Sequence, residues 1–111
     1  MINTYIVIPQ NKVQEGSSFT ATANFRLLDA STTPTTARYR IDDARTAGII
    51  RDWTDLTPAT SIDIDITPAD NVVISSIRNS ERRQLTVETN TGLDTQTRER
   101  IYWTVENIRE F

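Results

Sequence analysis

Three carboxylates have the spacing that comes nearest to catalytic chemistry in this sequence. Asp63 and Asp65 lie two residues apart within the segment 61–66, and Asp70 follows shortly after them. If the segment is a strand, Asp63 and Asp65 point to the same face about 7 Å apart, near the separation of paired carboxylates in glycoside hydrolases. Outward positions on an exposed strand are also common places for acids, and nothing in the sequence indicates a pocket around them. We therefore predict that the pair is not catalytic.

Calcium binding is the other chemistry that the acidic residues suggest. Asp63, Asp65 and Asp70 form one candidate group, and Asp42 with Asp43 forms another. Neither group has the spacing of an EF-hand loop, and calcium takes about six or more oxygen ligands. The sequence therefore predicts no cofactor and no metal, although a structural calcium ion stays open.

Nucleophilic catalysis lacks its usual residues. The chain has no histidine and no cysteine, and its single lysine is Lys12. A serine or threonine nucleophile would therefore have no activating base. The glycines Gly16, Gly48 and Gly92 are isolated, so they cannot form a loop that binds phosphate. We predict that the protein is not an enzyme.

Charge and hydropathy exclude further classes of protein. The net charge is −3 over 111 residues, and no basic run is longer than Arg82–Arg83. A nucleic-acid-binding protein would concentrate positive charge on one face, so we predict no nucleic-acid partner. The longest apolar run, Tyr5–Ile8, is too short to span a membrane or to form the core of a signal peptide. We expect that the protein is made in the cytoplasm, is not secreted and has no membrane partner.

Alternating apolar and polar residues indicate that the chain consists of strands. The alternation is clearest between Phe19 and Leu27, and no long window has the apolar stripe of a helix. The expected strands occupy residues 4–9, 18–28, 36–42, 48–53, 61–66, 84–89 and 98–108. About seven short strands separated by turn residues predict an all-β, antiparallel β-sandwich. We expect this sandwich to be a single domain over residues 1–111.

The segment 61–66 indicates how one of these strands is placed. Its three isoleucines would point between the two sheets, while its acids would face water. A slip by one residue would expose all three isoleucines, so the register should be strongly specified. Pro58 and Pro68 bracket the segment because proline cannot donate to a ladder. Asn71 follows where the chain crosses to the other sheet, and we expect its side-chain amide to bond to loop backbone.

The outer face of one predicted sheet is the first candidate for binding a partner. If residues 37–43, 84–89 and 98–108 share a sheet, that face carries Arg38, Arg40, Glu88, Arg98, Arg100 and Tyr102. Arginine and tyrosine are enriched at the centres of interfaces, which favours a docking surface. The alternative is ordinary cross-strand pairing of arginine with glutamate on a solvated sheet. The sequence leaves both interpretations open.

Two further places could contact a partner. Residues 1–9 contain consecutive apolar residues that cannot all face one core from one strand. They form either an edge strand of their own domain or an N-terminal arm that adds to the sheet of a neighbouring copy. Trp53 and Trp103 are expected in the core, with contact to a partner as the alternative for Trp53. The candidate interface residues are therefore Tyr5, Ile6, Arg38, Arg40, Trp53, Arg98, Arg100 and Tyr102.

Several stretches between residues 35 and 108 follow one another in an order that is found in a known family. They are Tyr39–Asp42, Trp53, Leu56-x-Pro58, Ile62–Ile66 with Asn71, Leu85–Val87 after Glu81–Arg83, and Tyr102–Asn107. In this order they resemble the immunoglobulin-like or fibronectin-III-like domains that occur as small virion proteins of tailed bacteriophages. The chain departs from antibody domains because it has no cysteine pair. It departs from larger modular phage proteins because it shows no linker.

The resemblance implies an immunoglobulin-like fold and a non-enzymatic structural role in the phage virion. A free-standing domain fits a capsid decoration protein or a head or tail accessory subunit, made in the host cytoplasm. Its partners would be capsid, collar or tail proteins, or further copies of itself as a homo-oligomer. The alternative function is a carbohydrate-binding or host-adhesion module of the same fold. That module needs aromatic rings exposed together, whereas the aromatic residues of this chain (Phe 3, Tyr 3, Trp 2) lie mostly at inward positions.

Overall fold

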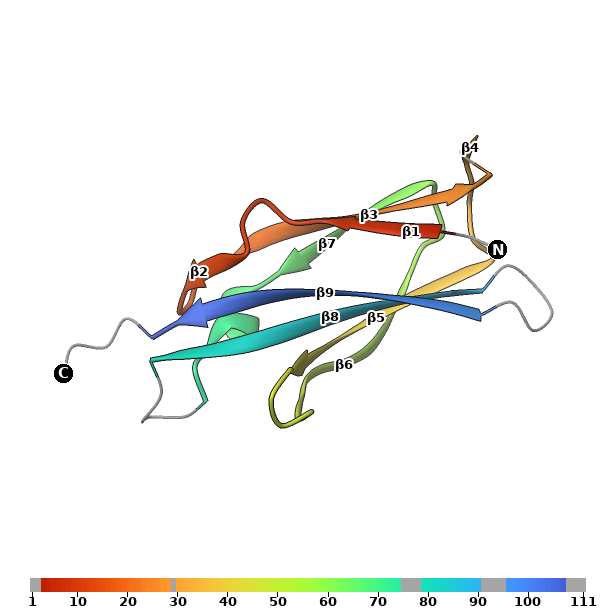
Figure 1. The fold of residues 1–111 in the computed structure, drawn as a ribbon. Helices are drawn as coiled ribbons and strands as arrows, with labels where there is room; N and C mark the ends of the chain where they lie inside the picture. The colour runs from red at the N-terminus through yellow and green to blue at the C-terminus, as the bar shows by residue number, and fades with distance from the viewer. Residues whose placement is uncertain (1–2, 29, 75–78, 91–95, 108–111) are drawn as a thin grey trace.

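A computed structural model of the chain describes residues 3–28, 30–74, 79–90 and 96–107, and most of these residues lie in strands (Figure 1). Their one helical element is a short 3-10 helix, η1, at Pro68–Asn71. The strands are β1 (Asn3–Val7), β2 (Lys12–Gln14), β3 (Phe19–Leu27), β4 (Ala30–Ser31), β5 (Thr36–Asp43), β6 (Ile49–Leu56), β7 (Ser61–Ile66), β8 (Ser80–Asn90) and β9 (Gln96–Glu106). The predicted all-β fold class is confirmed.

The strands form two sheets that pack face to face, as Figure 1 shows. In the first sheet β3 is central and pairs with β1, β4 and β7. The second sheet has the order β2-β9-β8-β5-β6. Within the described residues the strand pairs are antiparallel, except that β2 runs parallel to β9. The β-sandwich is thus confirmed with one parallel pair added, and its strand order is consistent with an immunoglobulin-like arrangement.

The parallel pair arises because the chain changes sheets without reversing its direction. β1 leaves the first sheet at Val7, and β2 joins β9 from Lys12 onward. Pro9 lies in the connection, where the lack of a proline N–H costs no ladder hydrogen bond. The sequence missed both β2, with three residues, and β4, with two, because such short strands show no alternation.

Two other strand boundaries differ from the predictions by three or more residues. β6 continues to Leu56, and β8 begins at Ser80 instead of at residue 84. Irregular pairing between β5 and β6 near Ile41 interrupts the alternation of β6. β8 begins with charged residues, which show no apolar alternation. Ile108, the predicted last residue of the final strand, lies outside the described residues, as does Gly92.

The core lies between the two sheets and is built from alternate residues of the long strands. Phe25, Ile64, Val87 and Trp103 come from four different strands, and each is at most 1% exposed. The ring of Phe19 meets Trp103 edge-on, with 5.3 Å between the ring centroids. Each fully buried large apolar side chain contributes roughly 1.5–3 kcal/mol. The core expected from the alternation is therefore confirmed, including the position of Trp103.

β7 confirms the orientation predicted for residues 61–66. Ile64 and Ile66 are buried, and Ile62 packs against the core while staying partly exposed. Asp63 and Asp65 alternate with the isoleucines and are exposed. A one-residue slip against β3 would bury both carboxylates, which is why this register is strongly specified.

Asn71 fixes the point where the chain leaves the first sheet. The side chain is fully buried, and its Nδ2 donates to the Ser17 carbonyl over 2.7 Å. The indole Nε1 of Trp103 donates to Asn71 Oδ1 over 2.8 Å, and the Gly16 N–H donates to the Asn71 carbonyl over 2.9 Å. The predicted bonding of the Asn71 amide to loop backbone is confirmed, and the bond to Trp103 adds a tie to the second sheet.

The N-terminal segment is an edge strand of its own domain. β1 pairs antiparallel with β3 from Asn3 opposite Arg26 to Val7 opposite Thr22. Of the two predicted arrangements, this structure of a single chain has the edge strand, with β1 paired to its own β3. The outward side chains of β1 stay uncovered, since Tyr5 and Val7 are more than half exposed.

Candidate interaction surface

The outer face of β5, β8 and β9 brings together the side chains that the sequence placed there. The register aligns Arg38, Glu88 and Arg98 in one row across the three strands. The next row holds Arg40, Thr86 and Arg100. A third row holds Asp42, Gln84 and Tyr102. We call this surface the arginine face.

Glu88 is the anion that orders the first row. Its Oε1 accepts from Arg38 Nε over 2.7 Å, and its Oε2 accepts from Arg98 Nε over 2.6 Å. Burial of the carboxyl would raise the pKa of Glu88, but the hydrogen bonds and positive charges of the two arginines outweigh it and lower that pKa. Glu88 therefore stays ionised and holds both guanidinium groups in place.

Trp53 of β6 lies on the arginine face and not in the core, so its predicted core position is wrong. The guanidinium carbon of Arg38 is 4.1 Å from the Trp53 ring centroid, and that of Arg40 is 5.2 Å away. Arg98 approaches the same ring to 5.9 Å. The reason is parity, because the next residue, Thr54, pairs with the inward-facing Tyr39. Trp53 is the last residue of the predicted strand 48–53, whose apolar and polar residues do not alternate, so no parity was assigned to it.

The arginine face has an excess of positive charge on a chain that is acidic as a whole. Apart from the ion pair between Lys12 and Glu106, its arginines are Arg38, Arg40, Arg82, Arg98 and Arg100, and its acids are Asp42, Asp55 and Glu88, so five cations minus three anions leave +2. The Arg82 guanidinium lies over the Tyr102 ring at 4.3 Å. Arg40 Nε pairs with Asp42 over 3.0 Å. Within the described residues the Arg100 guanidinium has no side-chain partner.

The structure does not bring the three acids Asp63, Asp65 and Asp70 together. Asp63 accepts a hydrogen bond from Thr22 Oγ1 over 2.9 Å at the surface. Asp70 is buried, and Arg51 binds it through both Nε and Nη2. The same Asp70 carboxylate accepts from the Thr67 N–H over 2.7 Å, which completes a capping box for η1.

Asp42 and Asp43, the other acids considered for calcium, belong to separate ion pairs. Asp42 faces outward to Arg40, whereas Asp43 accepts from Thr46 Oγ1 over 2.8 Å. Asp43 also lies 3.9 Å from Arg83 Nη1. No group of three or more acids is placed to hold a metal ion among the residues that the structure describes.

Arg83 is a buried cation that the sequence analysis missed. It is 0% exposed, pairs with Glu81 over 3.0 Å, and donates to the carbonyls of Asp70 and Val72 over 3.2 and 2.6 Å. The stretch Glu81–Arg83 looks like a solvated charge run, and this hid its role. Parity was the available signal, because Arg83 shares the inward side of β8 with Leu85.

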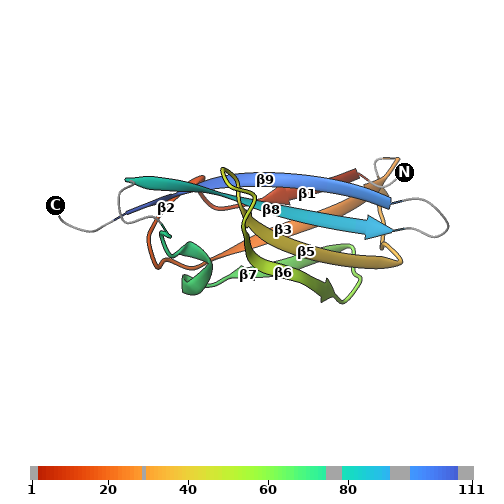
Figure 2. The same cartoon turned by 90° about the horizontal axis from the view of Figure 1, so that it is seen from below.

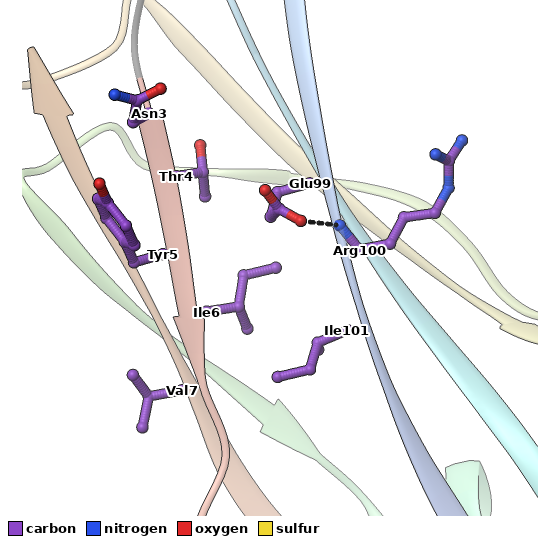
Figure 3. A pocket seen from close by; sticks show the side chains of 8 residues that line it. All are labelled: Asn3, Thr4, Tyr5, Ile6, Val7, Glu99, Arg100 and Ile101. Carbon is purple, nitrogen blue, oxygen red and sulfur yellow. Dashed lines mark hydrogen bonds between the residues drawn. The ribbon is translucent and has the colours of Figure 1, made fainter.

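A hollow of about 500 Å³ separates β1 from the opposing edge of β9. Figure 3 shows Thr4 and Ile6 on the side of β1 that faces β9, with Ile6 pointing toward Ile101, while Tyr5 points to the other side of β1. The candidate interface residues thus fall into two groups. Tyr5 and Ile6 lie on β1, and the other six lie on the arginine face.

Comparison of the sequence with models of known protein families finds no match, and comparison with curated proteins finds none either. Within its described residues the chain has no helix with the length and apolarity needed to cross a bilayer.

Proposed function

We propose that this chain is a non-enzymatic structural protein of a bacteriophage virion, a capsid decoration or a head or tail accessory subunit. It acts through protein–protein contacts made by the arginine face. The observation that carries the proposal is the position of Trp53, held on that face under the Arg38 guanidinium at 4.1 Å. The assignment to a phage rests on the resemblance of residues 35–108 to small immunoglobulin-like virion proteins.

The arginine face has the composition of a protein interface. Arginine, tryptophan and tyrosine dominate the energetic centres of protein–protein contacts. Salt bridges to Glu88 already hold Arg38 and Arg98, so docking orders fewer free side chains and loses less entropy. The excess of +2 favours an acidic partner surface, because complementary charge speeds encounter and fixes orientation.

Cross-strand pairing alone does not account for the whole face. The row Arg38–Glu88–Arg98 would suit any solvated sheet. Trp53, Tyr102 and Arg100 lie outside this row of paired charges, and among the described residues the Arg100 guanidinium has no side-chain partner. They fit a surface that a partner covers.

A carbohydrate-binding module, the alternative function, fits these residues less well. Glycan recognition needs open aromatic faces that lie together. Guanidinium groups lie over the rings of Trp53 and Tyr102, and Trp103 is buried. Tyr5 is exposed but belongs to the other sheet. These positions support contact with protein over contact with sugar.

The test is the copy number of the chain in purified phage particles, measured by quantitative mass spectrometry against the major capsid protein. We expect a fixed ratio in many copies per particle, because weak contacts on a symmetric lattice are multiplied by avidity. Particles purified in parallel from a phage lacking the gene give the background. A chain that is absent from intact particles contradicts the proposal.

A further inference from the structure

Two of the strands with an unpaired edge, β9 and β7, lie on opposite sides of the sandwich (Figure 2). In the described part of the chain, β9 pairs with β8 along one edge, and β2 covers its other edge only at Thr104–Glu106. The stretch Gln96–Trp103 therefore has free backbone groups. β7 pairs only with β3, so its outer edge is free as well. Such edges are templates for pairing with another chain.

The two free edges carry opposite charges at the same spacing. β9 presents Arg98 and Arg100 on its outward side, and β7 presents Asp63 and Asp65. All four side chains are exposed. Two residues along a strand span about 7 Å in both cases, so the charges match pairwise. In the described residues neither the Arg100 nor the Asp65 side chain has an ionic partner of its own.

Each edge repels a copy of itself. The antiparallel registers of two β9 strands that keep their outward side chains on one face place Arg98 opposite Arg100, or Arg100 opposite Arg100. In the corresponding registers two β7 strands place Asp63 opposite Asp65, or Asp63 opposite Asp63. Like charges directly opposite each other destabilise a strand pair. A two-fold contact through either edge is therefore disfavoured, whereas contact between unlike edges is not.

We propose that β7 of one copy adds antiparallel to the free edge of β9 of a second copy. In this register Asp63 lies opposite Arg100, and Asp65 lies opposite Arg98. Ile62, which is partly exposed, then lies opposite Ile101 at the hollow beside β1 (Figure 3). Acids and arginines share the outer side of the joined sheet, so the parity of both strands is respected.

The ladder forms chiefly at the first half of β7. The Asp65 carbonyl already accepts from Arg51 Nη1 over 3.3 Å, which marks its backbone as facing the free edge. By alternation the backbone groups of Ser61 and Asp63 face the same edge and are open to β9 of the second copy. The contact is head-to-tail, so repetition closes into a ring or continues as a filament. It depends on the two edges alone and not on the proposed virion role.

Charge reversal tests the proposal on the full chain by sedimentation velocity over a range of concentrations. We expect the average mass of the wild type to rise with concentration and to fall with added salt. Asp63→Lys and Arg100→Glu should each weaken association at least tenfold, because each puts like charges opposite each other. An equimolar mixture of the two variants, or the double variant Asp63→Lys with Arg100→Glu, should recover association, since every contact again joins opposite charges.

Two controls keep the outcomes distinct. Arg26→Glu reverses an exposed charge at the centre of the first sheet and should leave association unchanged. Melting temperatures of all variants should stay near that of the wild type, which shows that the fold persists. A wild type that remains monomeric at millimolar concentration overturns the proposal, as does a mixture of folded variants that fails to associate.

Discussion

Trp103 donates its indole N–H to Asn71 Oδ1 over 2.8 Å across the layers of the sandwich. Both side chains are almost completely buried, at 1% and 0% exposed. Asn71 also donates to the Ser17 carbonyl, so one side-chain amide ties η1 to β9 and to the loop before β3. Buried polar groups are stable only when they are bonded, which makes Asn71 the fixed point of the crossing between sheets.

Asn71→Ala should lower the free energy of unfolding by about 2–4 kcal/mol, measured by urea denaturation. The substitution leaves the Trp103 N–H and the Ser17 carbonyl buried without these partners, and each such group costs about 1–3 kcal/mol. Asn24→Ala, at a half-exposed position on β3, is the matched control and should change stability by about 0.5 kcal/mol or less. Equal effects of the two substitutions would contradict this role.

Truncation of the two neighbouring arginines Arg82 and Arg83 should lower the free energy of unfolding by very different amounts. Arg83→Ala should cost about 3–5 kcal/mol of unfolding free energy, because it removes a buried cation that lies 3.0 Å from the buried Glu81 carboxylate. Arg82→Ala removes only an exposed contact with Tyr102 and should cost about 1 kcal/mol or less. Guanidinium denaturation of both variants gives the comparison. A loss at Arg82 as large as that at Arg83 would show that burial is not the cause.

The alternation of apolar and polar residues predicted those parts of the fold in which apolar side chains are buried and polar side chains are exposed. Ile64, Phe25 and Trp103 are buried as their parity requires, because burying each is favourable on its own. Arg83 breaks this rule. It is buried only because Glu81 and the loop carbonyls after η1 surround it, and those partners come from the tertiary fold.

The candidate site was predictable to a similar extent. Arg38, Arg40, Arg98, Arg100 and Tyr102 lie on the face that strand parity assigned to them. The outward position of Trp53 was not predicted, since the irregular register of β6 against β5 hides its alternation. The free edges of β7 and β9 could not be predicted from the sequence either, because the order in which strands pair decides which strands end a sheet.

The free energy of unfolding should fall at acidic pH, because Glu88 becomes protonated there. Its pKa is lowered in the folded protein, so at low pH the unfolded chain binds the proton more readily. This contribution is fully present above the ordinary glutamate pKa, about 4.3, and is lost as the pH falls below it through the folded value. Urea denaturation between pH 7 and pH 3 measures the loss.

Glu88→Gln should reduce the loss of unfolding free energy at low pH, because the neutral amide cannot titrate. Glu99→Gln, an exposed position on β9, is the control and should keep the wild-type pH dependence. If Glu88→Gln and the wild type lose stability equally between pH 5 and pH 3, the Arg38–Glu88–Arg98 row does not supply the effect.

In the proposed function the arginine face holds this chain on its partner. The most direct measurement is the retention of two aromatic truncations on purified phage particles, each in competition with the wild type and quantified by mass spectrometry. We expect Trp53→Ala to be retained at least about tenfold less than the wild type, because interface tryptophans often contribute 2 kcal/mol or more. Tyr5→Ala, on the exposed side of β1, should be retained at the wild-type level. Retention of Trp53→Ala with loss of Tyr5→Ala would contradict the claim and place the contact on the other sheet.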